Sequence, residues 1–332
     1  MILNVSINFR LSNVWRSWYR FLRGKKRTRE LEQFSYHLED NLYQLYTELN
    51  HGIYRHGPYR KFIVHENKKR TIAVAPIRDR IVHRLLYEYL VLIFDQAFIY
   101  DAWSCRRGKG LIGAVDRTQE ILSGNSRSFV WRTDIRKFFD SVNCDILLHI
   151  LKRKIQDKKA LWLLEKIISS YHKQNSGTNR ESEERAPRIG IPIGNLTSQI
   201  FANIYLNELD RFVSHVVRPA AYLRYGDDFI IVHKDPKELI RIRTWVRDFL
   251  RNELNLELNP KNDILVPARR GLKFLGVEVF PRGKRLLKRN QQRVKILLNQ
   301  KNISSYYGVV KQHEGKKKFK EFLWKLLDLS DG

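Results

Sequence analysis

A short acidic turn between two apolar segments is the feature of this sequence that most constrains the fold. Ala221–Tyr225 and Phe229–Val232 flank the residues Gly226, Asp227 and Asp228. Two apolar arms around a tight turn predict a β-hairpin with the acids at its tip. Adjacent carboxylates inside an apolar hairpin are costly unless a cation neutralises them. An ordinary acidic turn would explain the same residues, since turns favour Asp and Gly.

A second apolar segment also ends in an acid. Phe129–Asp134 is predicted to be a short buried strand, and Asp134 precedes Asp227 by 93 residues. An Asp leaving one strand and an Asp-Asp pair at a hairpin tip can face each other across an antiparallel sheet. Asp134 and Asp227 would then bridge two divalent metals about 4 Å apart, with the Ile135 carbonyl as a further ligand and Asp228 in a supporting role. Ligation by oxygen alone indicates two Mg²⁺ ions.

The charge balance indicates a polyanionic partner. The 332 residues include 62 Lys and Arg against 35 Asp and Glu, which gives a net charge of +27. A ribosomal-type binding protein or a membrane-surface protein would share such an excess. Membrane attachment is disfavoured because no apolar run approaches the roughly 20 residues of a spanning helix.

Two cysteines exclude a disulfide scaffold and a four-cysteine zinc site. The first residues lack the order of a signal peptide, so we expect a cytoplasmic protein.

Hydrophobic periodicity predicts helices and hairpins in irregular alternation, which favours an α+β fold. The predicted helices are Leu31–Leu49, Ile77–Phe94, Ile146–Tyr171, Leu196–Val213 and Leu239–Leu254. The predicted strands, besides those above, are Tyr59–Val64, Arg70–Ala75 and Leu272–Phe280, and His172–Arg188 is predicted to be a loop.

Arg10–Arg29 is basic and interleaved with aromatic residues, a pattern suited to stacking and phosphate contacts with nucleic acid. The region after Pro281 is also strongly basic.

Six blocks in order resemble the motifs of reverse transcriptases, and together they span most of the chain. Asp134 to Asp140 is similar to motif A, Ile191 to Gln199 to motif B, and Tyr225 to Asp228 to motif C. The other blocks are Arg70–Val82 in the fingers, Ala102–Gly110, and Asn259-Pro260-Lys261 with Phe274-Leu275-Gly276 at the end of the palm. Six blocks in the right order are far more specific than any one of them.

The resemblance implies an RNA-directed DNA polymerase with a right-hand fold of fingers, antiparallel-sheet palm and short helical thumb. It implies a basic N-terminal extension over residues 1–50, fingers and palm over 51–280, and a basic helical thumb over 281–332. Template RNA, nascent cDNA and dNTPs would be its partners. Asp134, Asp227 and Asp228 would be the catalytic acids.

The resemblance also assigns roles at the nucleotide and the primer. Arg70 would contact the incoming nucleotide, Phe139 would lie under its sugar, and Lys261 would lie near the leaving pyrophosphate. An aromatic ring at Phe139 leaves no room for a 2′-hydroxyl, so we expect deoxynucleotide use. Leu275 and Gly276 would hold the primer end. The motif B residues of the nucleotide site would be Ile193, Gly194 and Gln199.

Motif B departs from the common pattern, in which Gln-Gly is followed by Ser-Pro. Here the block has Ile193-Gly194 and Ser198-Gln199, which resembles the enzymes of diversity-generating retroelements. That group copies a template RNA with errors at adenines and implies a structured RNA and a small basic accessory protein. A bacterial defence-associated or retron-like enzyme copying a dedicated non-coding RNA remains an alternative. So does a catalytically idle RNA-binding protein on a polymerase fold, although its three acids would then have no purpose.

Overall fold

The computed structural model describes residues 5–65, 69–173, 188–299 and 303–330, and it divides into two compact units. Unit 1 comprises residues 1–99, 136–209 and 249–257, and unit 2 comprises residues 100–135, 210–248 and 258–332. The predicted loop His172–Arg188 falls mostly on residues 174–187, which lie outside the described residues.

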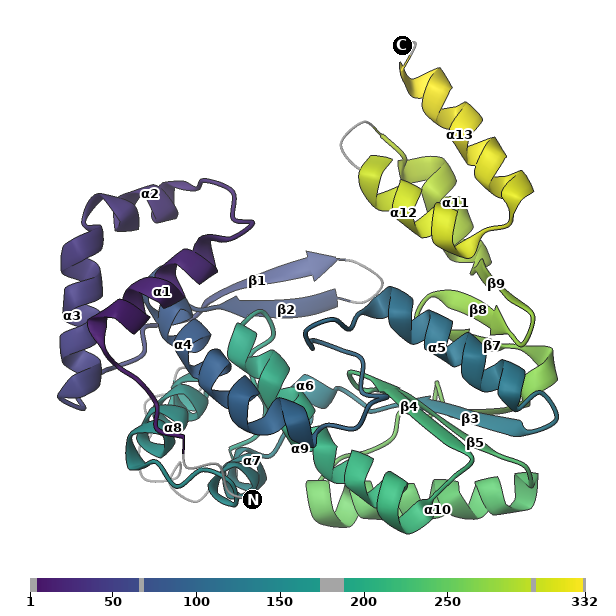
Figure 1. The fold of residues 1–332 in the computed structure, drawn as a ribbon, viewed down its shortest axis with the longest axis horizontal. Helices are drawn as coiled ribbons and strands as arrows, with labels where there is room; N and C mark the ends of the chain where they lie inside the picture. Colours follow the sequence, from purple (N-terminus) through teal and green to yellow (C-terminus); the bar gives the residue numbers. More distant parts are fainter. Residues whose placement is uncertain (1–4, 66–68, 174–187, 300–302, 331–332) are drawn as a thin grey trace. The chain divides into compact units, whose positions relative to one another are not determined.

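The described residues of unit 1 form mainly helices, with one hairpin (Figure 1). Its elements are α1 (Leu11–Leu22), α2 (Arg29–Tyr36), α3 (Leu38–Asn50), β1 (Arg60–His65), β2 (Lys69–Val74), α4 (Ile77–Phe94), the 3₁₀ turn Asp95–Ala97, α6 (Phe138–Ser141), α7 (Cys144–Lys152), α8 (Lys158–Lys173) and most of α9 (Leu196–Phe212). The predicted bounds of α4 are confirmed. The two predicted strands are also present, each shifted by one residue from its predicted range, and β1 pairs with β2 in an antiparallel hairpin.

Two predicted helices are each divided in the structure. The stripe over Leu31–Leu49 breaks at His37, whose φ of −110° and ψ of 41° are not helical. Ile146–Tyr171 forms α7 and α8, because Asp157 begins a new helix by accepting hydrogen bonds from the backbone N–H groups of Lys159 and Ala160. Periodicity alone does not register such a break when the apolar stripe resumes in phase.

Helix α1 is part of the packed interior of unit 1. Val14 and Trp18 are buried, and α1 packs against α4. The Arg80 guanidinium of α4 lies over the Phe21 ring at 5.3 Å. The aromatic side chains that sequence patterning associates with stacking on nucleic acid are therefore divided, with Trp18 and Phe21 in the core and Tyr19 exposed.

Unit 2 is built on an antiparallel sheet whose strand order, within the described residues, is β4-β5-β3-β6. Its strands are β3 (Phe129–Asp134), β4 (Ala221–Tyr225), β5 (Asp228–His233) and β6 (Ile264–Pro267). Helix α5 (Leu111–Gly124) contacts β4 and also β8 (Val277–Phe280) of a smaller sheet. Helix α10 (Pro236–Leu254) begins in unit 2 and ends in unit 1. Helices combined with antiparallel pairing between the strands of this sheet confirm the predicted α+β class.

The C-terminal part of unit 2 corrects one predicted strand. Leu272–Phe280 is two strands, β7 (Leu272–Phe274) and β8 (Val277–Phe280), because Leu275 and Gly276 take positive φ values of 50° and 83° and reverse the chain. Strand β9 (Gly283–Leu286) completes the smaller sheet. Helices α11 (Lys288–Leu297), α12 (Ile303–His313) and α13 (Lys316–Ser330) follow. Their buried residues Val294, Val310 and Phe322 join the same hydrophobic cluster as both sheets and α5.

In the part of the chain that the structure describes, no helix has the length and apolarity needed to cross a membrane.

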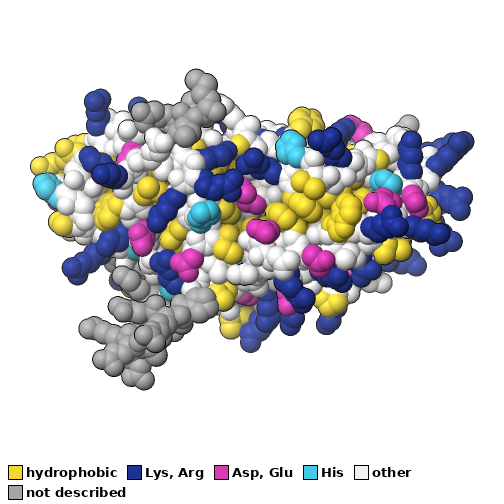
Figure 2. Space-filling model, turned by 90° about the horizontal axis from the view of Figure 1, so that it is seen from below, with side chains coloured by type: hydrophobic (Ala, Val, Ile, Leu, Met, Phe, Trp, Pro, Cys, Tyr) yellow, Lys and Arg dark blue, Asp and Glu magenta, His cyan; other side chains and the backbone are white. Residues whose placement is uncertain are grey.

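The positive charge is spread widely over the surface. Figure 2 shows Lys and Arg side chains outnumbering Asp and Glu on one face of the molecule. At the end of α1, residues 23–29 are exposed and mostly basic. Their charges can contact phosphates without altering the packing of Val14 and Trp18.

We predict that replacing Arg23, Lys26 and Arg27 together by Gln weakens RNA binding through electrostatics alone. Each lost phosphate contact on a single strand lowers the slope of log K against log salt by about 0.7, so the slope should fall by about two. Exposed substitutions of this kind change the free energy of unfolding by only about 0.5 kcal/mol. Filter binding to single-stranded RNA across a salt series measures the slope.

A matched control removes three exposed charges elsewhere in unit 1, at Lys158, Lys159 and Lys166 of α8. The slope should change less in this variant. Equal slopes for the two triple variants would mean that net charge alone, and not a contact at the end of α1, governs binding.

Candidate active site on the four-stranded sheet

The three predicted acids lie together at one end of the larger sheet. Asp134 is the last residue of β3 and Asp228 is the first residue of β5, and the two are direct partners in the antiparallel register. Directly opposed residues project from the same face of a sheet. Asp227 is half-buried in the turn immediately before Asp228. The predicted meeting of the two acidic segments is therefore present within unit 2.

The turn that carries Asp227 is as short as a hairpin permits. Tyr225 pairs with Asp228, which leaves Gly226 and Asp227 as its two central residues. Gly226 has a φ of 64°, and the first central position is where type II′ hairpin turns place glycine. A side chain at Gly226 would have space, since the nearest atom to an added Cβ is Ser104 Oγ at 3.8 Å. The positive φ, and not a lack of space, is therefore the reason that glycine is favoured at this position.

Asp134 is held by the loop that leads into β6. Its Oδ2 accepts hydrogen bonds from Asn262 Nδ2 at 2.9 Å and Asn259 Nδ2 at 3.3 Å. The backbone N–H of Asn259 donates to the Asp134 carbonyl at 2.9 Å. Among the described residues, the buried Asp134 Oδ1 has no hydrogen-bond partner. One carboxylate oxygen is thus fixed by two amides, while the other is removed from water without compensation, which is costly unless a cation or donor arrives.

Asp228 is paired with a cation from the same sheet. Arg132 Nη2 lies 3.1 Å from Asp228 Oδ1, and both side chains are partly buried. Arg132 precedes Asp134 by two residues on β3, so its side chain lies on the same face as the acids. The pair neutralises one of the two adjacent carboxylates of the turn.

A buried ion pair fixes the backbone of the acidic turn. Arg224 donates from Nε and Nη2 to the two carboxylate oxygens of Asp210 at 2.7 and 2.6 Å. Tyr222 Oη donates to the same carboxylate at 2.7 Å, and burial raises the pKa of Tyr222 well above its usual value, so the phenol stays protonated. The remaining Arg224 Nη1 donates to the Gly226 carbonyl at 3.0 Å. The residue before Asp227 is therefore tied to the interior of unit 2.

The oxygen atoms of the three acids show whether this sheet end fits a metal ion. Within the described residues, no three His, Cys, Asp or Glu side chains form a group that could hold a metal ion. Mg²⁺ does not require such a cage, since it is commonly bound by one or two carboxylates together with water and substrate phosphates. Asp134 Oδ1 is a buried oxygen without a partner among the described residues. An oxygen-only set of this kind fits Mg²⁺ bound together with substrate.

The other predicted residues of unit 2 lie on turns. Lys261 is exposed, and its backbone N–H donates to Asn259 Oδ1. Leu275 and Gly276 form the turn between β7 and β8, where Asn290 Nδ2 donates to the Gly276 carbonyl at 2.9 Å. The structure does not bring Lys261 into any described contact with Asp134, Asp227 or Asp228.

Five predicted nucleotide-binding residues lie in unit 1. Arg70 is exposed on β2, Gln199 is exposed on α9, and Phe139 is half-buried beside the fully buried Phe138. The Phe139 carbonyl accepts a hydrogen bond from Ile191 N at 2.8 Å, which joins motif A to motif B. Ile193 is half-buried, and Gly194 has a φ of 116°.

Sequence reasoning missed the residues that hold the acids in place. It included Asn259 in a motif without a role, and it did not single out Asn262, Arg132, Asp210 or Arg224. Arg224 and Asp210 lie 14 residues apart on different elements. An Arg inside a strand that is otherwise apolar is a usable indication, because a buried charge requires a partner.

A comparison with protein families identifies the family of this chain. Residues 60–279 match the model of the family described as reverse transcriptase (RNA-dependent DNA polymerase). The chain belongs to the reverse transcriptase family. The matched segment includes both acidic strands and motif B.

Several curated proteins resemble this reverse transcriptase. Protein YkfC of Escherichia coli is 28% identical over 69% of this chain and 68% of its own length. The group II intron-encoded protein LtrA of Lactococcus lactis is 23% identical over 79% of this chain and 53% of its own length. The chain therefore spans about half of LtrA. Among solved structures, telomerase from Candida albicans in complex with a telomeric RNA fragment matches 70% of this chain and 46% of its own, with 12% identity and a TM-score of 0.48.

We predict that Asp210→Ala lowers the free energy of unfolding by about 3–5 kcal/mol, because it leaves the buried Arg224 guanidinium without its counter-charge. Tyr222→Phe removes one hydrogen bond and keeps the ion pair, so it should cost only about 1 kcal/mol. Urea unfolding of both variants measures the difference. Similar losses in the two variants would contradict a buried ion pair as the main support of the turn.

Proposed function

We propose that this protein is an RNA-directed DNA polymerase that uses Asp134, Asp227 and Asp228 with two Mg²⁺ ions. The observation that carries the proposal is the register of β3 and β5, which opposes Asp134 and Asp228 and leaves Asp134 Oδ1 buried without a partner among the described residues. Membership of the reverse transcriptase family supplies the reaction. The three acids supply the oxygen ligands that this reaction needs.

Each neighbouring residue has a distinct task in this proposal. Asp134, Asp227 and the Ile135 carbonyl would hold the ions, which when bound activate the primer 3′-hydroxyl and stabilise the leaving pyrophosphate. Asn259 and Asn262 orient Asp134 by occupying its Oδ2. The ion pair of Asp228 with Arg132 accords with a supporting role for that acid.

We predict that Asp227→Asn and Asp134→Asn each abolish primer extension and leave RNA binding nearly intact. Each change removes a metal ligand and leaves the basic surface as it is. Extension of a DNA primer on an RNA template with Mg²⁺ measures the first property, and filter binding measures the second.

The result also separates the polymerase from an idle RNA-binding protein on the same fold. If the wild type extends the primer and both variants do not, the result supports catalysis by these acids. Extension at a near wild-type rate by either variant would remove the metal assignment. Binding without extension by the wild type would favour the idle protein.

The substrates and partners follow from the same proposal. Phe139 is half-buried, unlike Phe138, so its ring is available to exclude a 2′-hydroxyl and select dNTPs. Arg70 would contact the nucleotide and Lys261 would lie near the pyrophosphate, while Leu275 and Gly276 would hold the primer end. Template RNA, nascent cDNA and a small basic accessory protein or structured non-coding RNA complete the system, which we place in the cytoplasm.

Copying with errors at template adenines is the finer part of the proposal. It is supported by the motif B pattern, in which Ile193 replaces the common Gln, and Ser198-Gln199 the common Ser-Pro. Ile193 is half-buried, and its backbone carbonyl is engaged by Ala73 N. Its side chain offers no donor or acceptor to a nascent base pair. The common Gln can hydrogen-bond near the sugar and base of the incoming nucleotide, and loss of that bond lowers the penalty for a mismatch.

We predict that Ile193→Gln raises fidelity at template adenines by about one to two orders of magnitude. A good bidentate contact of this kind is worth ~1–3 kcal/mol, and about 1.4 kcal/mol corresponds to tenfold in rate. Sequencing cDNA made by the wild type and the variant on a mixed RNA template measures the error rate at each base.

Faithful copying at adenine by the wild type would exclude the mutagenic retroelement enzyme. It would favour a defence-associated or retron-like enzyme instead. Errors that are equally frequent in Ile193→Gln would keep the retroelement assignment and remove Ile193 as its cause.

A further inference from the structure

The β1–β2 hairpin of unit 1 has little support of its own. Within the described residues it pairs with no further strand, and most of its residues are exposed. An isolated two-stranded hairpin is at best marginally stable in water. Its orientation must therefore be set where Ala73 and Ala75, both buried, attach it to the rest of unit 1.

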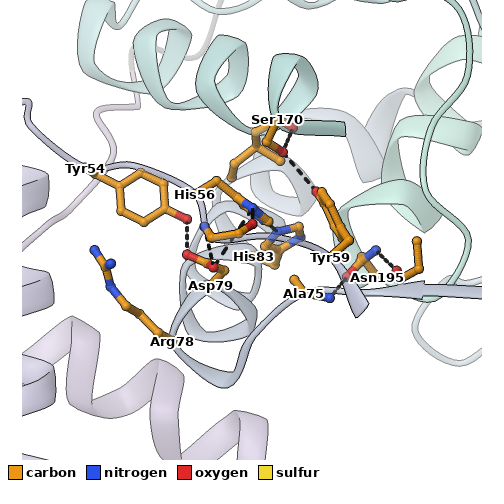
Figure 3. Close-up of polar contacts among 12 residues, drawn as sticks. Tyr54, His56, Tyr59, Ala75, Arg78, Asp79, His83, Ser170 and Asn195 are labelled. Atoms are coloured by element: carbon orange, nitrogen blue, oxygen red, sulfur yellow. Dashed lines mark hydrogen bonds and ion pairs between the residues drawn. The ribbon is translucent and has the colours of Figure 1, made fainter. Parts of the chain in front are cut away.

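That attachment is made by motif B, mainly through the side chain of Asn195. Asn195 Nδ2 donates to the Ala73 carbonyl at 2.7 Å, and Asn195 Oδ1 accepts from Ala75 N at 3.1 Å. The Ala73 N–H donates to the Ile193 carbonyl at 2.8 Å. One carboxamide and one carbonyl thus pair with backbone groups at the end of β2 and of the residue that follows it, as a neighbouring strand would. Figure 3 shows the Asn195 side chain directed at this backbone.

The glycine between Ile193 and Asn195 lets the two segments approach. A Cβ added at Gly194 would lie 2.8 Å from Ile72 Cγ2 and 3.3 Å from the Ala73 carbonyl oxygen. Gly194 also has a φ of 116°, which L side chains rarely adopt. Close packing and hydrogen bonding therefore fix the same three residues of motif B against β2.

The start of α9 is fixed separately to helix α4. Thr197 Oγ1 lies 2.6 Å from His83 Nδ1, and His83 Nε2 lies 3.0 Å from His56 Nε2 (Figure 3 shows the two histidines). Burial lowers the pKa of His83 well below its usual value, so this ring is neutral at physiological pH. The segment from Ile193 to Thr197 is therefore anchored on one side to β2 and on the other to α4.

We infer that Asn195 is a positioning residue for nucleotide selection, because it fixes the strand that carries Arg70 to the motif B segment that carries Ile193. The inference rests on the proposed polymerase function and assigns it a residue that contacts no nucleotide. Asn195 acts through the backbone of Ala73 and Ala75, and the paired strands transmit that position to Arg70. Without it, the hairpin samples orientations in which Arg70 misses the incoming nucleotide.

If Asn195 only stabilised the fold, a different result would be expected. Losing a buried amide that only stabilises the fold lowers the melting temperature and leaves the KM of the folded protein unchanged. Asn207 provides the matched control, because it is equally buried in α9 of the same unit, and its Oδ1 has no partner among the described residues. Asn207→Ala removes the same side chain without touching β2.

The experiment measures kcat and KM for dNTP in single-primer extension by the full chain. The variants are Asn195→Ala, Asn195→Asp, Arg70→Ala, the double variant Arg70→Ala with Asn195→Ala, and Asn207→Ala. Two lost hydrogen bonds predict that Asn195→Ala raises the KM about tenfold, with a smaller change in kcat. Asn195→Asp keeps an acceptor for Ala75 N and loses the donor to Ala73, so its KM should rise as well. It serves where the alanine variant does not fold.

The double variant gives the sharpest result. If Asn195 works through Arg70, removing both should raise the KM no further than Arg70→Ala alone, whereas independent effects multiply. Asn207→Ala should have the wild-type KM at a lowered melting temperature. A wild-type KM in folded Asn195→Ala and Asn195→Asp, or KM effects that multiply in the double variant, would overturn the inference. Absence of extension by the wild type would instead contradict the proposed function.

Discussion

The antiparallel pairing of β3 with β5 is the interaction on which the candidate site depends. Its register places Asp134 opposite Asp228 at the end of the sheet. Side chains alternate between the two faces, so a shift of one residue would move Asp134 to the opposite face and bring Thr133 to the face of the acids in its place. The buried residues Trp131 and Phe229, whose rings meet edge to face at 5.6 Å, make such a shift costly. The apolar residues of the two strands thus fix the position of their acids.

Charge compensation is uneven around this sheet end. The buried Asp210 has Arg224 and Tyr222, and Asp228 has Arg132. Asp134 has two amides on one oxygen and, among the described residues, no partner on the other. Neutral amides orient a carboxylate without cancelling its charge, whereas an arginine cancels it. In the proposed function, this arrangement would keep the charge of Asp134 for a cation that arrives with the substrate, whereas the charges of Asp210 and Asp228 are already paired with arginines.

The sequence allowed the acidic strands, α4, the acidic hairpin and the α+β class to be predicted, because each depends on patterns within a few residues. What could not be predicted depends on distant partners or on local dihedral angles. The divisions at His37 and Asp157 leave the apolar stripe intact, and the reversal at Leu275 and Gly276 follows from positive φ values. Strand β6 and the amides of Asn259 and Asn262 are defined by β3, more than 120 residues away. The family motifs could name Asp134 as a site residue, but not the residues that hold it.

The two outer strands of the larger sheet have a consequence for solubility during folding. The outer edge of β4 is covered near its C-terminal end, since Arg224 N donates to the Asp101 carbonyl and Trp103 N donates to the Arg224 carbonyl. On the other side, β6 spans only Ile264–Pro267 and ends in a residue that has no N–H to offer. Edges that are short, covered or interrupted by proline give an incoming strand little backbone to pair with. The sheet that carries the acids is thereby protected against edge-to-edge aggregation, even though its strands are among the most apolar segments of the chain.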